Sequence, residues 1–470
     1  MRIPFFISLL ILGFAFAGPL RAETIVERDV KVAERETEAQ EEISKAKRKA
    51  EEQKAMEGIK SITFQEILKD PDNIELNIRY AKQQINNNNF MSAAGTLERI
   101  LMLQPDMAQA RLFYAIVLFR LDNLNEAERE LKTILKYDMP EDLREDVDLY
   151  LDRVRMSRKN TRYTVRQSNG YEMDDNRNAA PSSKRQLSSN APVGLSGTNR
   201  KRRDTSFLNI TNVQVSHDPG FQAGHRVYGD FTYFLQEQTM VDNLDIQSFR
   251  GELGLELKSN FLNVVPSFFF NHLYLSRETF LRSQGFSLAA NRNLGKRFAV
   301  DSTFAYEYQD YLNIAENTTS VERKGPQISL DGRLHYLLTP SMRLSFGMGY
   351  LNKNAKAEFN SYERLAMNAQ HLWFLKKGIY LINGLDAGFD YYEEIENAVA
   401  GRHRRDKTLR YRTTLGLPLA ILKFDKILPK FVRGITMNLT YEYYRSLSTI
   451  TNYTYHNNKY QAILTKTWEF

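Results

Sequence analysis

From about residue 160 onward the chain alternates between apolar and polar residues, and no other feature constrains the fold as strongly. In one segment near the C-terminus the residues of one face are Ile435, Met437, Leu439, Tyr441 and Tyr443, and those of the other are Thr436, Asn438, Thr440, Glu442 and Tyr444. Because successive side chains of a strand point to opposite sides of a sheet, this segment predicts a strand with one apolar and one polar face.

The last strand ends on aromatic residues, Trp468 and Phe470. A free chain end is usually polar and frayed, so this ending indicates a strand that is fixed in place with its aromatic side chains at an interface. A transmembrane β-barrel has that arrangement, because it is apolar outside and aromatic at its two rims. The last strand of a soluble β-sandwich is the alternative interpretation of this stretch.

The number of strands separates the two alternatives. About 14 alternating segments of about ten residues follow residue 160, and a tilted strand of that length crosses a bilayer. Their expected starts lie near Asn160, Thr205, His225, Leu244, Leu262, Phe280, Arg297, Lys324, Met342, Lys356, Gly378, Asp406, Gly434 and Lys459. We therefore expect residues 160–470 to form a 14-stranded transmembrane antiparallel β-barrel. Its polar lumen wall is expected to include Arg250, Glu252, Glu256, Arg333, Arg410 and Arg412.

The connections between these segments alternate in character, as they do in outer-membrane barrels, which have short periplasmic turns and longer outer loops. The short connections contain residues 258–260, 293–296, 339–341 and 376–378, and the long ones contain residues 310–322 and 393–405. Two connections depart from this rule, because 420–430 is long and 352–356 is short. The longest connection, 171–204, is expected to be mobile and external or folded into the lumen. With an even number of strands, the start of the first strand and the end of the last strand lie on the same side of the membrane, which is expected to be the periplasm.

The N-terminus reads as a secretory signal, with Arg2 followed by an apolar run and then small residues. Cleavage is expected after Ala22, with Ala17 as the alternative. Residues 23–60 are rich in Glu, Lys, Arg and Ala, which predicts a charged tether. The chain contains no cysteine, so it has no disulfide framework and no thiolate metal site.

Residues 61–157 are expected to form a periplasmic repeat domain of the tetratricopeptide type. Asp70-Pro71-Asp72 recurs as Gln104-Pro105-Asp106, which is a shift of 34 residues and the period of that repeat. Stacked helix pairs of this kind form an α-solenoid with a concave face that binds peptides or proteins. The residues expected on that client-binding face are Glu75, Ile78, Lys82, Asn86, Gln109, Leu112, Ile116 and Arg120. Packing of its apolar residues against the tether or the barrel is the alternative. Asn77 and Arg111 depart from the repeat pattern, which usually has a large apolar residue there.

The sequence gives no sign of catalysis or of a cofactor. Its seven histidines are scattered without the spacing of a metal site, and phosphate-binding glycine loops are absent. The dense basic cluster 200–203 lies in a Ser/Asn/Pro-rich connection, which does not indicate nucleic-acid binding. We therefore expect a protein that is not an enzyme and that binds no nucleic acid, metal or cofactor.

Several local motifs resemble one family, the surface lipoprotein assembly modifiers (Slam proteins) of Gram-negative outer membranes. The segment Gly170-Tyr171 through Asp174-Asp175-Asn176-Arg177-Asn178-Ala179-Ala180-Pro181 resembles the segment that opens the barrel in that family, with departures at Glu172 and Met173. The C-terminal part is similar at Gly434-Ile435-Thr436, Tyr441-Glu442-Tyr443, Arg445, Ser446, Tyr453, Tyr455, Asn458 and Phe470. Together with the order of repeats and barrel, the resemblance covers nearly the whole mature chain.

This resemblance implies a multidomain α+β protein of the outer membrane that moves client proteins to the cell surface. The implied clients are lipoproteins or related secreted haem- or metal-binding proteins. The repeats are expected to bind the client in the periplasm, and the route runs through the barrel or along the seam near 163–167 and 460–467. Further expected partners are outer-membrane lipid and the barrel assembly machinery, which would bind the C-terminal strand. The alternative function is an outer-membrane polysaccharide export pore with a periplasmic repeat domain.

Overall fold

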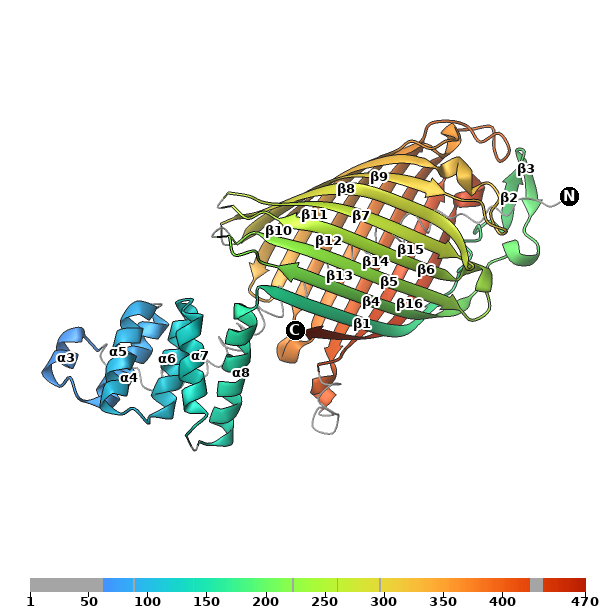
Figure 1. The fold of residues 1–470 in the computed structure, drawn as a ribbon. Coiled ribbons are helices and arrows are strands. Elements are labelled where there is room, and N and C mark those ends of the chain that lie inside the picture. Colours follow the sequence, from blue (N-terminus) through green and yellow to red (C-terminus); the bar gives the residue numbers. More distant parts are fainter. Residues whose placement is uncertain are drawn as a thin grey trace. The chain divides into compact units, whose positions relative to one another are not determined.

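The computed structural model describes residues 62–470 except 88, 138, 222–223, 260, 296 and 423–433. The expected signal peptide and the charged tether therefore lie outside the described residues. The described chain forms two compact units, one helical and one made of strands, and the division falls between Arg162 and Tyr163. Figure 1 shows both units.

The helical unit consists of antiparallel helix pairs. Its helices are α3 (Phe64–Lys69), α4 (Ile74–Asn86), α5 (Phe90–Leu103), α6 (Ala108–Arg120), α7 (Leu124–Ile134) and α8 (Glu141–Arg158). The starts of α4 and α6 are 34 residues apart, as are those of α5 and α7, so the predicted solenoid of tetratricopeptide-like repeats is confirmed. No helix in the described part of the chain is long and apolar enough to cross a membrane.

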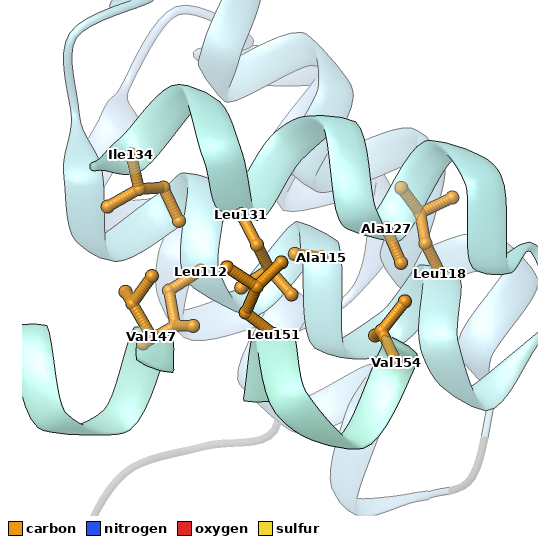
Figure 2. Close-up of a cluster of buried hydrophobic side chains, with 9 residues drawn as sticks. All are labelled: Leu112, Ala115, Leu118, Ala127, Leu131, Ile134, Val147, Leu151 and Val154. Atoms are coloured by element: carbon orange, nitrogen blue, oxygen red, sulfur yellow. The ribbon is translucent and has the colours of Figure 1, made fainter. Parts of the chain in front are cut away.

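Apolar residues at helical spacing fill the space between the pairs. One cluster of buried side chains belongs to α6, α7 and α8, and it is drawn in Figure 2. Its members are Leu112, Ala115, Leu118, Ala127, Leu131, Ile134, Val147, Leu151 and Val154. Because the small residues Ala115 and Ala127 are almost fully buried, the helices approach closely at these positions.

The two departures from the repeat pattern are explained by hydrogen bonds. Asn77 is fully buried, and its Nδ2 donates to the carbonyl oxygen of Pro71 over 2.8 Å. Arg111, one repeat later, donates to the carbonyl oxygen of Pro105, the equivalent turn. Each side chain thus satisfies a carbonyl group of the turn between repeats, which an apolar residue cannot do.

The second unit is a closed antiparallel barrel of 14 strands, as predicted. The strands are β1 (Thr161–Asp174), β4 (Asp204–His217), β5 (Arg226–Gln238), β6 (Ile246–Glu256), β7 (Asn263–Leu275), β8 (Glu278–Leu294), β9 (Phe298–Tyr311), β10 (Gly325–Thr339), β11 (Met342–Lys353), β12 (Tyr362–Phe374), β13 (Tyr380–Tyr392), β14 (Arg405–Pro418), β15 (Thr436–Ser448) and β16 (Tyr455–Glu469). Strands that are consecutive in this series pair with each other, and β1 pairs with β16 to close the barrel.

The faces of the barrel follow the alternation of the sequence. Leu253 is 67% exposed and Leu330 is 53% exposed, whereas Ser248 and Asp390 are 1% exposed. Large apolar side chains thus project outward, and polar side chains point to the inner face. A lipid-facing barrel requires this distribution, whereas a soluble sandwich requires the reverse.

The strand boundaries depart from the sequence expectation at three places. The strand expected near Lys356 begins at Tyr362, because residues 358–360 form a 3₁₀ turn. The last strand begins at Tyr455 rather than near Lys459. The longest connection begins after Asp174 rather than at Tyr171, because β1 continues to that residue. This connection also contains a two-stranded hairpin that the sequence did not predict, β2 (Arg185–Ser188) and β3 (Ala191–Gly194).

Candidate functional site

The first and last strands form the seam of the barrel. Their register runs from Thr164 opposite Glu469 to Asp174 opposite Lys459. β1 therefore begins, and β16 ends, at the same end of the barrel, which we call the terminus end. The opposite end, where β1 ends and β16 begins, is the loop end. Trp468, expected at an interface, lies opposite Val165, and Phe470 is 53% exposed.

At the loop end the family-like segment 170–181 binds the start of β16. Asn457 Nδ2 donates to both carboxylate oxygens of Asp174 over 3.1 Å. The backbone N and the Nδ2 of Asn458 donate to Asp175, each over 2.9 Å. Asn176 Nδ2 donates to the carbonyl oxygen of His456. These side chains reach across the seam and add to its backbone ladder.

A second layer of this network is ionic and buried. Glu172 pairs with Arg177 over 3.3 Å, and Lys459 Nζ lies 3.7 Å from Asp174. Glu172 also accepts a hydrogen bond from Gln236 of β5. Glu172, Asp174 and Arg177 are nearly inaccessible to solvent, and Lys459 is 16% exposed and also lies 3.9 Å from Glu172. Removal of Lys459 therefore leaves the buried carboxylate of Asp174 without its cationic partner.

The connection that follows, residues 175–203, extends beyond the seam, and we call it the strap. Asn452 accepts from the backbone N of Leu187 and donates to the carbonyl oxygen of Leu187 over 3.0 Å. The backbone N atoms of Ser189 and Asn190 donate to the carbonyl oxygens of Ala398 and Val399. The strap therefore docks on loop 449–454, between β15 and β16, and on loop 393–404, between β13 and β14 (Figure 1).

The two loops beneath the strap are themselves tied together. Val399, Ala400, Ile450 and Tyr453 form an almost inaccessible apolar cluster, against which Leu187 packs. The hydroxyl group of Tyr453 donates to Glu396 over 3.1 Å. Burial raises the pKa of Tyr453 to about 12 and raises the pKa of Glu396 above its ordinary value. The strap thus rests on a packed support rather than on independent loops.

The charged residues expected on the lumen wall point to the inner face, and several of them pair with each other. Arg250 lies 3.1 Å from Glu252, and Arg412 lies 2.6 Å from Glu442. Arg410 lies 3.7 Å from the same Glu442. Glu256 and Arg333 are half-buried and also lie on the inner faces of their strands. Glu442 is not among the lumen residues expected from the sequence, although the alternation places it on the polar face of β15.

The face of the helical unit that was expected to bind a client is mostly accessible. Its exposed members are Glu75, Lys82, Asn86, Gln109 and Arg120, while Ile78 and Ile116 are partly buried against the cores. Leu112 does not belong to this face. It is 5% exposed, because α8 packs Val147 and Leu151 into the same cluster. The assignment of Leu112 to the client-binding face is therefore wrong.

In the helical unit, Glu128 of α7 joins α7 to α8. It lies 2.8 Å from Lys132 and 3.7 Å from Arg155, and it also pairs with Arg158. The hydrogen bond from Lys132, together with the nearby positive charges, holds the pKa of Glu128 below its ordinary value.

A lowered carboxyl pKa gives stability that is present above the ordinary pKa and is lost as the pH falls through the pKa of the folded state. The melting temperature of the helical unit is therefore expected to fall between about pH 5 and about pH 3.

The variant Glu128→Gln should lose about 1 kcal/mol of folding stability at pH 7, and no more, since the cationic partners of Glu128 are half-exposed. In a unit of this size that loss is about 4–8 °C. Circular dichroism of the helical unit measures the melting temperature. Glu126→Gln, which removes a more exposed pair, should change the melting temperature little. If the melting temperature of Glu128→Gln depended on pH as strongly as that of the wild type, Glu128 would not be the cause of the pH dependence.

Comparison with known proteins identifies the barrel. Residues 163–470 match the surface lipoprotein assembly modifier family, and this is more than half of the chain. The chain belongs to this family. In the helical unit, residues 92–144 match the tetratricopeptide repeat. The family-like seam segment and the C-terminal strands lie within the matched range, so the resemblance noted from the sequence is confirmed. Membership of this family supports a role in the surface assembly of lipoproteins.

No curated protein matches the chain. Among solved structures, the tetratricopeptide domain of P58(IPK) is 26% identical over 20% of this chain, with a TM-score of 0.19, and this chain spans 27% of that protein's length. Pseudomonas aeruginosa OpdL is 12% identical and OccK5 (OpdH) is 8% identical, each over 66% of this chain. The matches cover 99% and 98% of those chains, with TM-scores of 0.32 and 0.33. Scores this low do not establish a shared function.

The described residues contain no group of three or more His, Cys, Asp or Glu side chains arranged to hold a metal ion. In the basic cluster of the strap, Lys201 pairs with Asp175 over 3.1 Å, and Arg202 donates to the carbonyl oxygen of Met240. These two side chains therefore make contacts within the barrel unit. The strongest candidate site in the described chain is the seam with its loop-end network and the strap.

Proposed function

We propose that this protein is an outer-membrane translocator that binds a client protein in the periplasm through its helical repeats and delivers it to the cell surface through or along its barrel. Membership of the surface lipoprotein assembly modifier family is the observation that carries this proposal. The clients are lipoproteins or related secreted haem- or metal-binding proteins. The polysaccharide-pore alternative has no comparable support, because the barrel itself matches a family named for lipoprotein assembly.

The placement in the membrane follows from the two faces of the barrel. Its exposed apolar outer surface is suited to lipid, and the barrel fits an outer membrane. In this proposal the helical repeats lie in the periplasm. The terminus end of the barrel then faces the periplasm as well, because the chain passes directly from α8, which ends at Arg158, into β1, which starts at Thr161. In this proposal insertion uses the barrel assembly machinery, which binds the C-terminal strand β16.

Surface display tests the proposal. Candidate client lipoproteins are co-expressed with the protein, and the accessibility of each client to added protease is measured on intact cells. We expect at least a tenfold rise in accessible client over cells that lack the protein. No rise with any client of the class would refute the proposal.

The role of the repeats is tested by reversing charge on the exposed face of α4 and α6. The variant Lys82→Glu/Arg120→Glu is expected to lower display several-fold, because both side chains belong to the face that is expected to bind the client. Lys69→Glu/Lys136→Glu changes the net charge equally at exposed positions outside this face and should display normally. Equal display by the two variants would place client binding elsewhere. Protein level and barrel folding are checked in both.

A further inference from the structure

The seam differs from all other strand pairs of the barrel in its chain connections. Every other neighbouring pair is joined by a stretch of chain at one of its ends, but β1 and β16 are joined at neither. Separation of these two strands therefore requires only the loss of non-covalent contacts. In the hydrocarbon region each freed backbone group costs several kcal/mol unless another group takes its place, so the seam opens readily only when a further strand pairs with the exposed edges.

The contacts across the seam differ along its length. In the loop half the side chains of Asp174 and Asp175 bind β16, and the strap continues across to loops 449–454 and 393–404. In the terminus half, Ser168 Oγ lies 2.9 Å from Thr465 Oγ1, and Arg166 Nε donates to Thr467 over 3.4 Å. The loop half is thus bound by carboxylate–amide contacts and by a separate segment of chain that continues across the seam. In the described part of the chain the terminus half has no such segment across it, and its Ser168–Thr465 contact is between neutral hydroxyl groups that an incoming strand can replace.

The outer surface beside the seam carries an independent feature. Tyr171 and Met173 project outward from β1, and by the same alternation so do Gln167 and Asn169. Asn209 Nδ2 of β4 donates to Asn169 Oδ1 over 2.7 Å, and Thr211 Oγ1 donates to Gln167 Oε1, also over 2.7 Å. We call these four residues the amide patch: Gln167, Asn169, Asn209 and Thr211.

The position of the amide patch is unusual for a lipid-facing wall. Asn169 and Asn209 lie near the middle of their strands, where the outer surface of a barrel contacts acyl chains. Amide groups that face hydrocarbon are costly and usually mark a functional site. Their spare donors and acceptors match those of a peptide backbone. Extended protein chain alongside β1 would therefore meet hydrogen-bonding groups there, whereas lipid would not benefit from them.

We propose that the seam is a gate that opens from the terminus end while its loop end stays closed. Residues Thr164–Ser168 separate from Thr465–Glu469, an extended segment of the client pairs with the exposed edges, and the amide patch binds that segment at the outer surface. The strap and the Asp174–Asp175 network keep the loop end closed. The proposal rests on the proposed function and specifies where the client enters the barrel wall.

Disulfides test the gate cleanly, because the chain has no cysteine of its own. Ser168→Cys/Thr465→Cys locks the terminus half of the seam, and Leu187→Cys/Asn452→Cys locks the strap. Ser267→Cys/Ser287→Cys is the matched control, because these hydroxyl groups lie 2.7 Å apart between directly opposed residues of β7 and β8. The oxidised seam lock should lower client display at least tenfold, and reductant should restore it. The oxidised strap lock and the oxidised wall lock should display normally.

The contrary outcomes are distinct. Normal display by the oxidised seam lock, or loss of display in the oxidised strap lock alone, would overturn the gate and favour exit through the loop end. Absence of display by the cysteine-free parent would instead refute the proposed function. Gel mobility before and after reduction gives the cross-linked fraction in each variant.

A second experiment tests the amide patch without a disulfide. Asn169→Leu/Asn209→Leu makes the outer surface more apolar, so the barrel should insert and remain folded at least as well as the parent. Display should nevertheless fall several-fold. Asn383→Leu/Thr413→Val replaces a similar outward-facing pair on β13 and β14, where Thr413 donates to Asn383 over 2.9 Å, and should display normally. Equal display by both variants would remove the amide patch from the route.

Discussion

Replacing Asp390 with alanine is expected to destabilise the barrel by about 3–5 kcal/mol. Asp390 of β13 lies directly opposite Arg364 of β12, and its two carboxylate oxygens accept from the Nε and Nη2 atoms of that arginine. Their side chains are 0% and 7% exposed. The substitution removes the counter-charge and leaves a guanidinium group buried beside the ring of Tyr362. The measurement is the temperature at which the barrel in detergent loses its compact form on gel electrophoresis.

Two controls make this result specific. Asp310→Ala removes the partner of Lys324 in a pair whose side chains are 37% and 38% exposed, and it should cost at most about 1 kcal/mol. The double variant Arg364→Met/Asp390→Leu removes both charges and should recover much of the loss, because an apolar pair leaves no buried charge without a partner. An Asp390→Ala barrel as stable as Asp310→Ala would show that the pair contributes nothing to the wall.

Replacing Gly170 with alanine is expected to impair closure of the barrel, with a loss of about 3 kcal/mol from overpacking. A Cβ atom at this position would lie 2.1 Å from the carbonyl oxygen of Ala462 and 2.7 Å from the Cα atom of Ile463. Both obstacles are backbone atoms of β16, so no side-chain rotation relieves the contact. Strand β1 must therefore shift against β16, which disturbs the ladder that closes the barrel.

A matched glycine separates this steric effect from a general effect of alanine. Gly332 of β10 has no atom within 4 Å of the position that a Cβ atom would occupy, so Gly332→Ala should fold like the parent. The fraction of protein that runs as compact barrel on gels, compared between the two variants, is the measurement. Equal fractions would mean that the close approach at Gly170 does not limit closure.

The strands were predictable because their signal is local. Outward Ile328, Leu330 and Leu334 alternate with inward Arg333 and His335 within a single segment, so neighbouring residues suffice to place the strand and its two faces. The boundary error at β12 arose where residues 358–360 form a turn with no strong sequence signal. The same local logic identified the helix pairs from their period.

The strap and the core position of Leu112 were not predictable, because both depend on distant residues. Leu187 and Asn452, which anchor the strap, are separated by 265 positions in the chain. The local sequence around either residue does not identify the other as its partner. Leu112 occupies the same position in its repeat as the half-exposed Ile78, but Val147 and Leu151 of α8 cover it. Periodicity gives the face of a helix, whereas the neighbour that covers this face is fixed only by tertiary packing.

The hairpin of the strap has a consequence for immunology and for labelling. All four residues of β3, Ala191–Gly194, are exposed, and Ser189 and Asn190 form the adjoining turn with positive φ angles. If the terminus end faces the periplasm, as we propose, this hairpin is presented to the exterior of the bacterium as a contiguous epitope. An antibody raised against it would bind unbroken cells and so give an optical marker for the orientation of the barrel.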